Sequence, residues 1–162
     1  MGYSIYAANS AGTASESPSI TVYALPVINY SFKNGTVGQS YSDYVTVSGG
    51  KSSYTWTKES GTLPDGLSMR SSGSYLYLEG TPSTPGTYNF TLKVKDANGK
   101  AATKSFTVTI AGVAPTITTS SLKDGYVGES YSDTLSATGT TPITWSALGL
   151  PSGLSCSNAG KI

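Results

Sequence analysis

Apolar and polar residues alternate with a period of two along residues 88–95. Every second position is apolar, at Tyr88, Phe90, Leu92 and Val94. One face is therefore apolar and the other polar, which is typical of a half-buried antiparallel strand and not of a helix. Residues 96–100 (DANGK) supply a turn, because Asn-Gly tolerates the positive φ of a tight hairpin. The alternation returns after the turn, at Phe106, Val108 and Ile110, so the pattern predicts a β-hairpin.

Shorter segments of the same kind precede this hairpin. Val45 and Val47 alternate with polar residues, Trp56 lies in the next segment, and further strands are expected around 67–69 and 75–78. Together they make about seven short strands in about 85 residues, a pattern typical of an immunoglobulin-like sandwich. The predicted fold class is all-β, an antiparallel β-sandwich of the immunoglobulin-like type.

A tyrosine near the start of the hairpin predicts a further packing feature. Tyr88 follows Pro85-Gly86-Thr87, as in a tyrosine corner, where a phenol at the start of strand F bonds back to the backbone upstream. We expect the Tyr88 hydroxyl to find such a partner.

An internal repeat runs through the chain. KNGTVGQSYSD at 33–43 returns as KDGYVGESYSD at 123–133, with 8 of 11 positions identical, and LPDGLS at 63–68 returns as LPSGLS at 150–155. Residues 2–22 give a weaker parallel to the hairpin at 86–108. The two copies of the first motif begin 90 residues apart, and a repeat at a fixed period indicates stacked or chained units of one fold.

These landmarks predict three parts. Residues 1–25 are expected to be the C-terminal hairpin, strands F and G, of a truncated Ig-like repeat. Residues 26–112 are expected to be a complete repeat, and residues 113–162 the N-terminal half of another. The chain is thus expected to be a fragment of a tandem array. Exposed apolar faces on its two truncated ends predict head-to-tail association between molecules.

Composition excludes several classes of function. Ten basic and nine acidic residues leave a net charge of +1, too little to draw the chain onto nucleic acid. Histidine is absent, which excludes imidazole relays and imidazole-bound metals. The acidic residues are scattered, so no catalytic and no cofactor-binding residue is predicted and the chain is expected not to be an enzyme. No apolar run is long enough to predict a transmembrane segment.

Two longer motifs resemble a known family. LPDGLSM at 63–69 and LEGTPSTPGTYNFTLKVKDANG at 78–99 resemble the He_PIG family, the Ig repeats of bacterial surface proteins in the cadherin-like superfamily. The resemblance implies a tandem module of a large secreted or surface-anchored protein. Its expected location is extracellular, at the bacterial cell surface, with signal and anchor outside these residues. Its expected partners are neighbouring Ig-like repeats of the same polypeptide.

The cadherin kinship raises the question of calcium. Asp96 and Asn98 resemble the acidic motif at the end of strand F and are the candidate Ca²⁺ ligands. The junction 111–115 (AGVAP) has no acidic residue, whereas Ca²⁺ takes six to eight oxygen ligands. The alternative, which we favour, is that Asp96 is an ordinary turn residue that accepts backbone N–H bonds and that no cofactor is bound.

The expected function is a non-catalytic structural spacer. The alternative is an adhesin module that binds a surface glycan or a protein receptor, with calcium dependence in the cadherin manner. For that alternative the candidate carbohydrate-binding residues are Tyr75 and Tyr77, on an expected edge segment. Trp56 and Trp145 recur at matching positions and are expected to be core or half-buried rings. Cys156 matches the apolar Met69 and is expected to be a small buried side chain.

Overall fold

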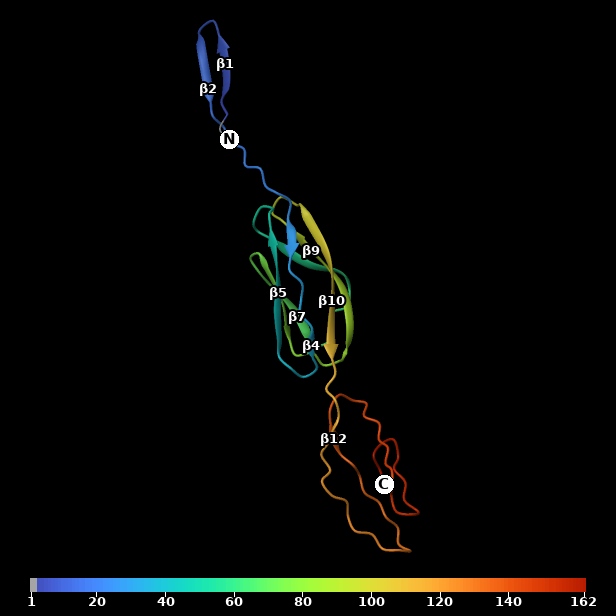
Figure 1. The fold of residues 1–162 in the computed structure, drawn as a ribbon. Helices are drawn as coiled ribbons and strands as arrows, with labels where there is room; N and C mark the ends of the chain where they lie inside the picture. The colour runs from blue at the N-terminus through green and yellow to red at the C-terminus, as the bar shows by residue number, and fades with distance from the viewer. Residues whose placement is uncertain (1–2) are drawn as a thin grey trace.

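The computed structural model describes residues 3–162 and is all-β throughout them, as the sequence predicts. A central sandwich lies between a hairpin on its N-terminal side and a loosely paired segment on its C-terminal side (Figure 1). No helix in the described part of the chain is long and apolar enough to cross a membrane.

Two four-stranded sheets form the central sandwich. The first has the order β3-β5-β8-β7, from β3 (Val27–Asn29), β5 (Tyr41–Ser48), β8 (Tyr75–Gly80) and β7 (Leu67–Ser72). The second has the order β4-β10-β9-β6, from β4 (Gly35–Thr36), β10 (Ala101–Ala111), β9 (Gly86–Lys95) and β6 (Thr55–Gly61). All pairs are antiparallel except β4 with β10, which is parallel.

The predicted hairpin is β9–β10, and its alternation decides what the sandwich encloses. Phe90, Leu92 and Val94 point inward and are buried, while the residues between them lie on the outer face. Residues from both sheets complete the core: Ile28, Phe32, Tyr41, Val45, Val47, Trp56, Leu67, Leu76, Leu78, Phe106, Val108 and Ile110. Burial of these apolar surfaces is the main stabilising term of the sandwich.

The tyrosine corner is confirmed. The Tyr88 hydroxyl donates to the carbonyl of Thr84 at 3.0 Å, four residues upstream on the loop that leads into β9. This bond fixes the loop against the start of the strand.

Both copies of the repeated motif have the same local geometry. The Tyr41 hydroxyl donates to the Lys33 carbonyl at 2.7 Å, and the Lys33 N–H donates to Asp43 Oδ2 at 2.7 Å. In the second copy the Tyr131 hydroxyl donates to the Lys123 carbonyl, and the Lys123 N–H donates to Asp133 Oδ2, both at 3.0 Å. In each copy glycine is required because a Cβ on Gly35 or Gly125 would lie 2.9 Å from the tyrosine ring.

The flanking parts carry few tertiary contacts. Strands β1 (Ile5–Asn9) and β2 (Gly12–Glu16) form an exposed antiparallel hairpin. In the C-terminal segment, residues 113–162, only β11 (Thr116–Ile117) and β12 (Ala137–Thr138) pair as strands among the residues described. Apolar side chains remain exposed in both parts, as at Tyr6 and Val127.

Backbone hydrogen bonds hold the chain where it enters and leaves the central sandwich. Gly50 donates its N–H to the Ala24 carbonyl at 2.7 Å. On the other side Val113 makes two bonds to Thr140: its N–H donates to Oγ1 at 2.7 Å and its carbonyl accepts the Thr140 N–H at 2.9 Å. We call the stretches around Ala24 and Val113 the connectors. Each contacts a loop of the unit that it leads into: Ala24 contacts the loop after β5, and Val113 contacts the loop after β12.

Two expectations about single residues are wrong. Strand β8, which carries Tyr75 and Tyr77, is not an edge strand, because it pairs with both β5 and β7 and β7 forms the edge. Cys156 is half-buried rather than buried, since few side chains cover the C-terminal segment.

Candidate functional site

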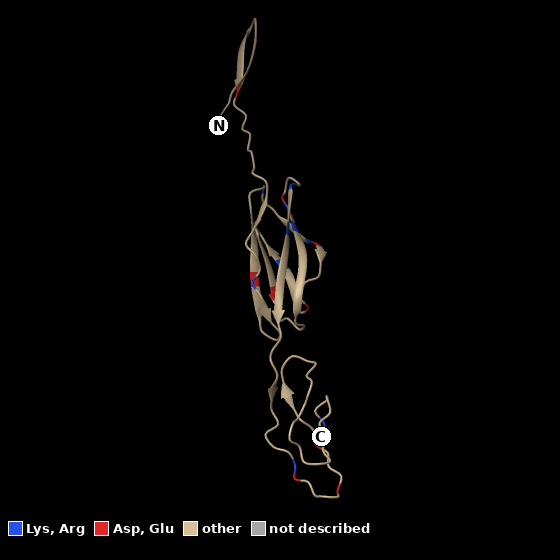
Figure 2. Cartoon of the chain, turned by 45° about the vertical axis from the view of Figure 1, so that its right-hand side comes forward, with Lys and Arg blue, Asp and Glu red and all other residues tan. Residues whose placement is uncertain are grey.

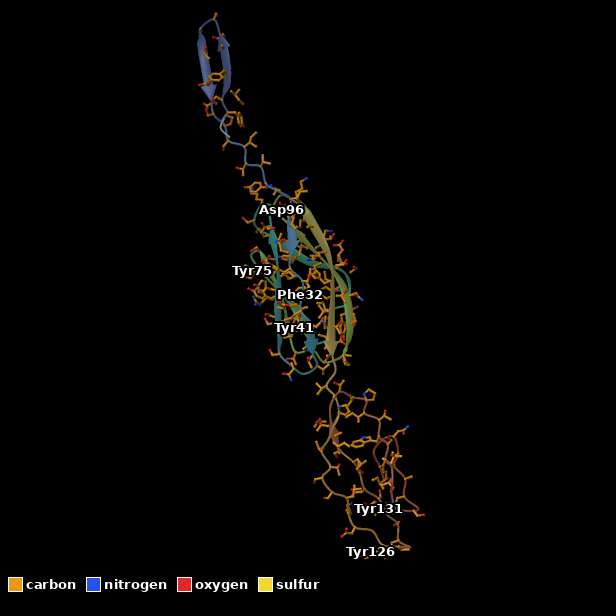
Figure 3. The ribbon with its side chains drawn as sticks, in the orientation of Figure 1. Phe32, Tyr41, Tyr75, Asp96, Tyr126 and Tyr131 are labelled. Atoms are coloured by element: carbon orange, nitrogen blue, oxygen red, sulfur yellow. The ribbon has the colours of Figure 1, made fainter. Side chains whose placement is uncertain are left out.

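Aromatic side chains gather on the outer surface of the sheet β3-β5-β8-β7. Tyr44, Tyr75 and Tyr77 form a contiguous group with ring centroids 5.5–6.1 Å apart, and Tyr30 adds a fourth ring 6.5 Å from Tyr44. We call these four tyrosines, together with Arg70, the tyrosine face. Figure 3 shows Tyr75 at the outer margin of the sandwich, whereas Phe32 lies within it.

Strand alternation and register place these side chains together. Val45, Leu76 and Leu78 point into the core, so their neighbours Tyr44, Tyr75 and Tyr77 must point outward. The register aligns Tyr44 with Tyr77, and Tyr77 in turn with Arg70 on β7. One row across three strands therefore carries two phenols and a guanidinium.

An ion pair closes one side of the tyrosine face. Arg70 donates to both carboxylate oxygens of Glu79, at 2.7 and 3.1 Å, and its guanidinium carbon lies 4.3 Å from the Tyr77 ring centroid. The hydrogen bond from Arg70 holds the pKa of Glu79 below its usual value. Arg70 is thereby fixed over the ring, and the two charges neutralise each other.

Tyr30 has an uncommon backbone conformation. Its φ is 69°, and it is the single non-glycine residue with positive φ among residues 3–162. An L-residue with a large side chain is strained in this region. The Tyr30 carbonyl accepts a hydrogen bond from Lys104 Nζ, and the ring lies edge-on to Tyr44.

The candidate calcium ligand Asp96 lies at the end of the sandwich nearest the N-terminal hairpin (Figure 3). Its Oδ2 accepts the Lys51 N–H at 2.9 Å, and its Oδ1 accepts the N–H groups of Asn98 and Lys100 at 2.9 and 2.8 Å. The bond from Lys51, then those from Lys100 and Asn98, hold the pKa of Asp96 below its usual value against the opposing effect of burial. The carboxylate thus ties the β9–β10 turn to the loop after β5.

Asn98 occupies the exposed turn beside Asp96. Its backbone N–H, not its side chain, makes the bond to Asp96. Among residues 3–162, no three His, Cys, Asp or Glu side chains are grouped closely enough to hold a metal ion. Figure 2 shows the charged residues spread along the chain rather than gathered in one segment.

A cavity of about 500 Å³ opens in the C-terminal segment. Leu122, Tyr126, Val127, Tyr131, Leu154 and Ile162 contribute to its lining. In the central sandwich the matching segment contacts β10, since Val37 donates its N–H to the Ala111 carbonyl and β4 pairs with β10. The cavity therefore lies where the central sandwich has a strand.

Two of the five members of the tyrosine face are predictable from the sequence pattern used above, and three are not. Tyr75 and Tyr77 are in it, whereas Tyr30, Tyr44 and Arg70 were not predicted. The alternation of Tyr44 with the apolar Val45 was a usable signal for an outward ring. Arg70 could be found only through the pairing of β7 with β8. Trp56 is buried and Trp145 half-buried, as expected.

Family and structural comparisons agree with this architecture. The model of the family "Putative Ig domain" (He_PIG) matches residues 20–111, which include the whole central sandwich. The chain belongs to this family. No curated protein sequence matches it.

Solved titin domains share the Ig-like fold. Titin domains I67–I69, in an E-to-A variant, align at 19% identity with a TM-score of 0.53, over 87% of this chain and 52% of that one. The tandem Ig repeats of Dlar align at 21% identity with a TM-score of 0.38, over 71% and 64% of the two chains. A "putative alpha-galactosidase/melibiase" of Bacteroides fragilis aligns at 25% identity with a TM-score of 0.45, over 54% of this chain. This chain spans 18% of that protein.

Proposed function

We propose that this chain is a non-catalytic spacer module of a secreted or cell-surface bacterial protein, linked to neighbouring Ig-like repeats of the same polypeptide. The observation that carries the proposal is the path of the chain, which enters the central sandwich at one end and leaves it at the other (Figure 1). Units joined in this way extend a polypeptide with each repeat.

The connectors support the same role. Ala24 is bound by the Gly50 N–H, and Val113 by the N–H and the hydroxyl of Thr140, so each is held by a loop of the unit that it leads into and the free part of the connector is short. Prolines at 26 and 115 stiffen the same stretches. A spacer needs this stiffness and needs no reactive group.

Small-angle X-ray scattering of the 162-residue chain tests the proposal. A compact chain of this length has a radius of gyration of about 15 Å. We expect a clearly larger value, with circular dichroism showing that the sample is folded. A Gly-Ser insertion after Gly112 should broaden the distance distribution, because it separates Val113 from the unit before it. A radius near that of the compact chain would contradict the spacer role.

We further propose that the connectors work without calcium. Both Asp96 oxygens already accept backbone N–H groups, three in all, so little of the acceptor capacity of the carboxylate is left for a cation. Calorimetric titration with CaCl₂ should show no binding in the sub-millimolar range. Sub-millimolar binding that is lost in Asp96→Asn would contradict this and restore the cadherin-like alternative.

A further inference from the structure

The internal repeat separates what the fold requires from what the tyrosine face adds. Tyr41 and Trp56 of the central sandwich recur as Tyr131 and Trp145. Members of the tyrosine face do not recur in the same way. Because these residues differ where the framework is shared, the shared framework does not require the rings that are replaced.

Strand register shows which residues of the C-terminal segment correspond to Tyr44 and Tyr77 at the centre of the tyrosine face. Tyr44 pairs with Tyr77 in the central sandwich, and the matching bridge in the C-terminal segment joins Thr134 to Lys161. Ser120, three residues before Lys123, stands where Tyr30 stands before Lys33. Three aromatic rings of the face are thus replaced by small or charged side chains in the other copy.

Tyr30 adds an independent observation. Its positive φ is strained, and strain of this kind persists where the surrounding structure or a function requires it. Burial does not offset this strain, since the side chain is 66% exposed. What the conformation achieves is to place a ring beside Tyr44 at the end of the aromatic group.

We propose that the tyrosine face is a binding site for a neutral polysaccharide. Sugar rings present C–H faces that pack on aromatic rings and hydroxyls that need hydrogen-bond partners. The phenols supply both, because each has an apolar ring and a polar tip. The register adds polar neighbours in the same rows, with Thr46 and Ser72 beside Tyr75. Arg70 and Glu79 neutralise each other, so the face favours an uncharged ligand.

The size of the face favours a glycan over a protein. With strands about 4.8 Å apart and outward residues about 6.8 Å apart, four strands and three rows cover roughly 400 Å². A stable protein–protein interface needs about 800 Å² from each partner. The face is thus too small for a standard protein interface and is large enough for a short run of sugar rings.

Affinity electrophoresis of the 162-residue chain tests the proposal, with laminarin, xylan, mannan and pullulan as probes. The wild-type chain should be retarded by at least one of them. Tyr44→Ala and Tyr75→Ala should each raise the dissociation constant for that polysaccharide about tenfold. Tyr126→Ala is the matched control, because Tyr126 is an exposed tyrosine (75%) in the C-terminal segment, and it should bind as wild type.

A second variant separates binding from folding. Tyr30→Gly relieves the positive-φ strain and removes one ring, so binding should weaken while the melting temperature stays the same or rises. Each variant is checked by circular dichroism. No retardation by any of the four polysaccharides, or equal loss in Tyr126→Ala and Tyr75→Ala, would overturn the proposal. Neither outcome bears on the spacer role, which the scattering experiment tests separately.

Discussion

The Tyr41 hydroxyl offers a direct test of how the repeated motif stabilises the sandwich. The side chain is 4% exposed, and its hydroxyl donates to the Lys33 carbonyl at 2.7 Å. Burial, and then the negative charge of Asp43, raise the pKa of this phenol, so it is neutral and donates at any ordinary pH. Tyr41→Phe removes the donor and keeps the ring that packs on Gly35.

The expected loss follows from the contact. A buried neutral hydrogen bond contributes about 1 kcal/mol net, and a carbonyl left without its donor adds to the cost. We expect the free energy of unfolding to fall by about 1–2 kcal/mol in Tyr41→Phe. In a domain of this size each kcal/mol lowers the melting temperature by roughly 4–8 °C.

Urea denaturation provides the measurement. In a Trp145→Phe background, the fluorescence of Trp56 reports the central sandwich alone, because Trp56 is part of its core. The matched control is Tyr131→Phe, which has the same composition and removes the equivalent bond from the C-terminal segment. It should leave the Trp56 transition unchanged. Wild-type stability in Tyr41→Phe, or an equal shift in both variants, would refute the reasoning.

Three further predictions follow from the described contacts. Because the pKa of Asp96 is lower in the folded than in the unfolded chain, the ionised carboxylate stabilises the fold above the unfolded pKa of about 3.9. This stabilisation is lost as pH falls through the lower folded pKa. Acid titrations followed by Trp56 fluorescence should show the loss, and Asp96→Asn should make the stability less dependent on pH in this range. Tyr88→Phe should cost about 1 kcal/mol through the bond to Thr84, and Tyr88→Ala about 3 kcal/mol because the ring is lost as well; equal losses in urea melts would show that the hydroxyl has no role. Sedimentation velocity should show head-to-tail self-association of the chain, because apolar side chains are exposed at both ends, and a monomer that persists at high concentration would contradict this.

Much of the fold could be predicted from local pattern. The alternation in β9 and β10 and the turn between them depend on neighbours in the sequence, so the sequence determined the hairpin, its inward face and its turn. The Tyr88 bond reaches only four residues upstream and was predicted for the same reason. The repeated motif likewise encloses its own hydrogen bonds, since Lys33, Tyr41 and Asp43 lie within one short segment.

The tertiary structure decided which strands are neighbours, and with that the site. Alternation shows that Tyr75 and Tyr77 share a face, but not that β5 lies on one side of them and β7 on the other. Only that pairing brings Tyr44 and Arg70 to Tyr77 and makes β8 a central strand. The contact between Asp96 and Lys51 also depends on the tertiary structure, because Lys51 lies in the loop between β5 and β6 whereas Asp96 lies in the β9–β10 turn. Sequence period is a property of one strand, whereas strand order depends on how the two sheets close over a common core.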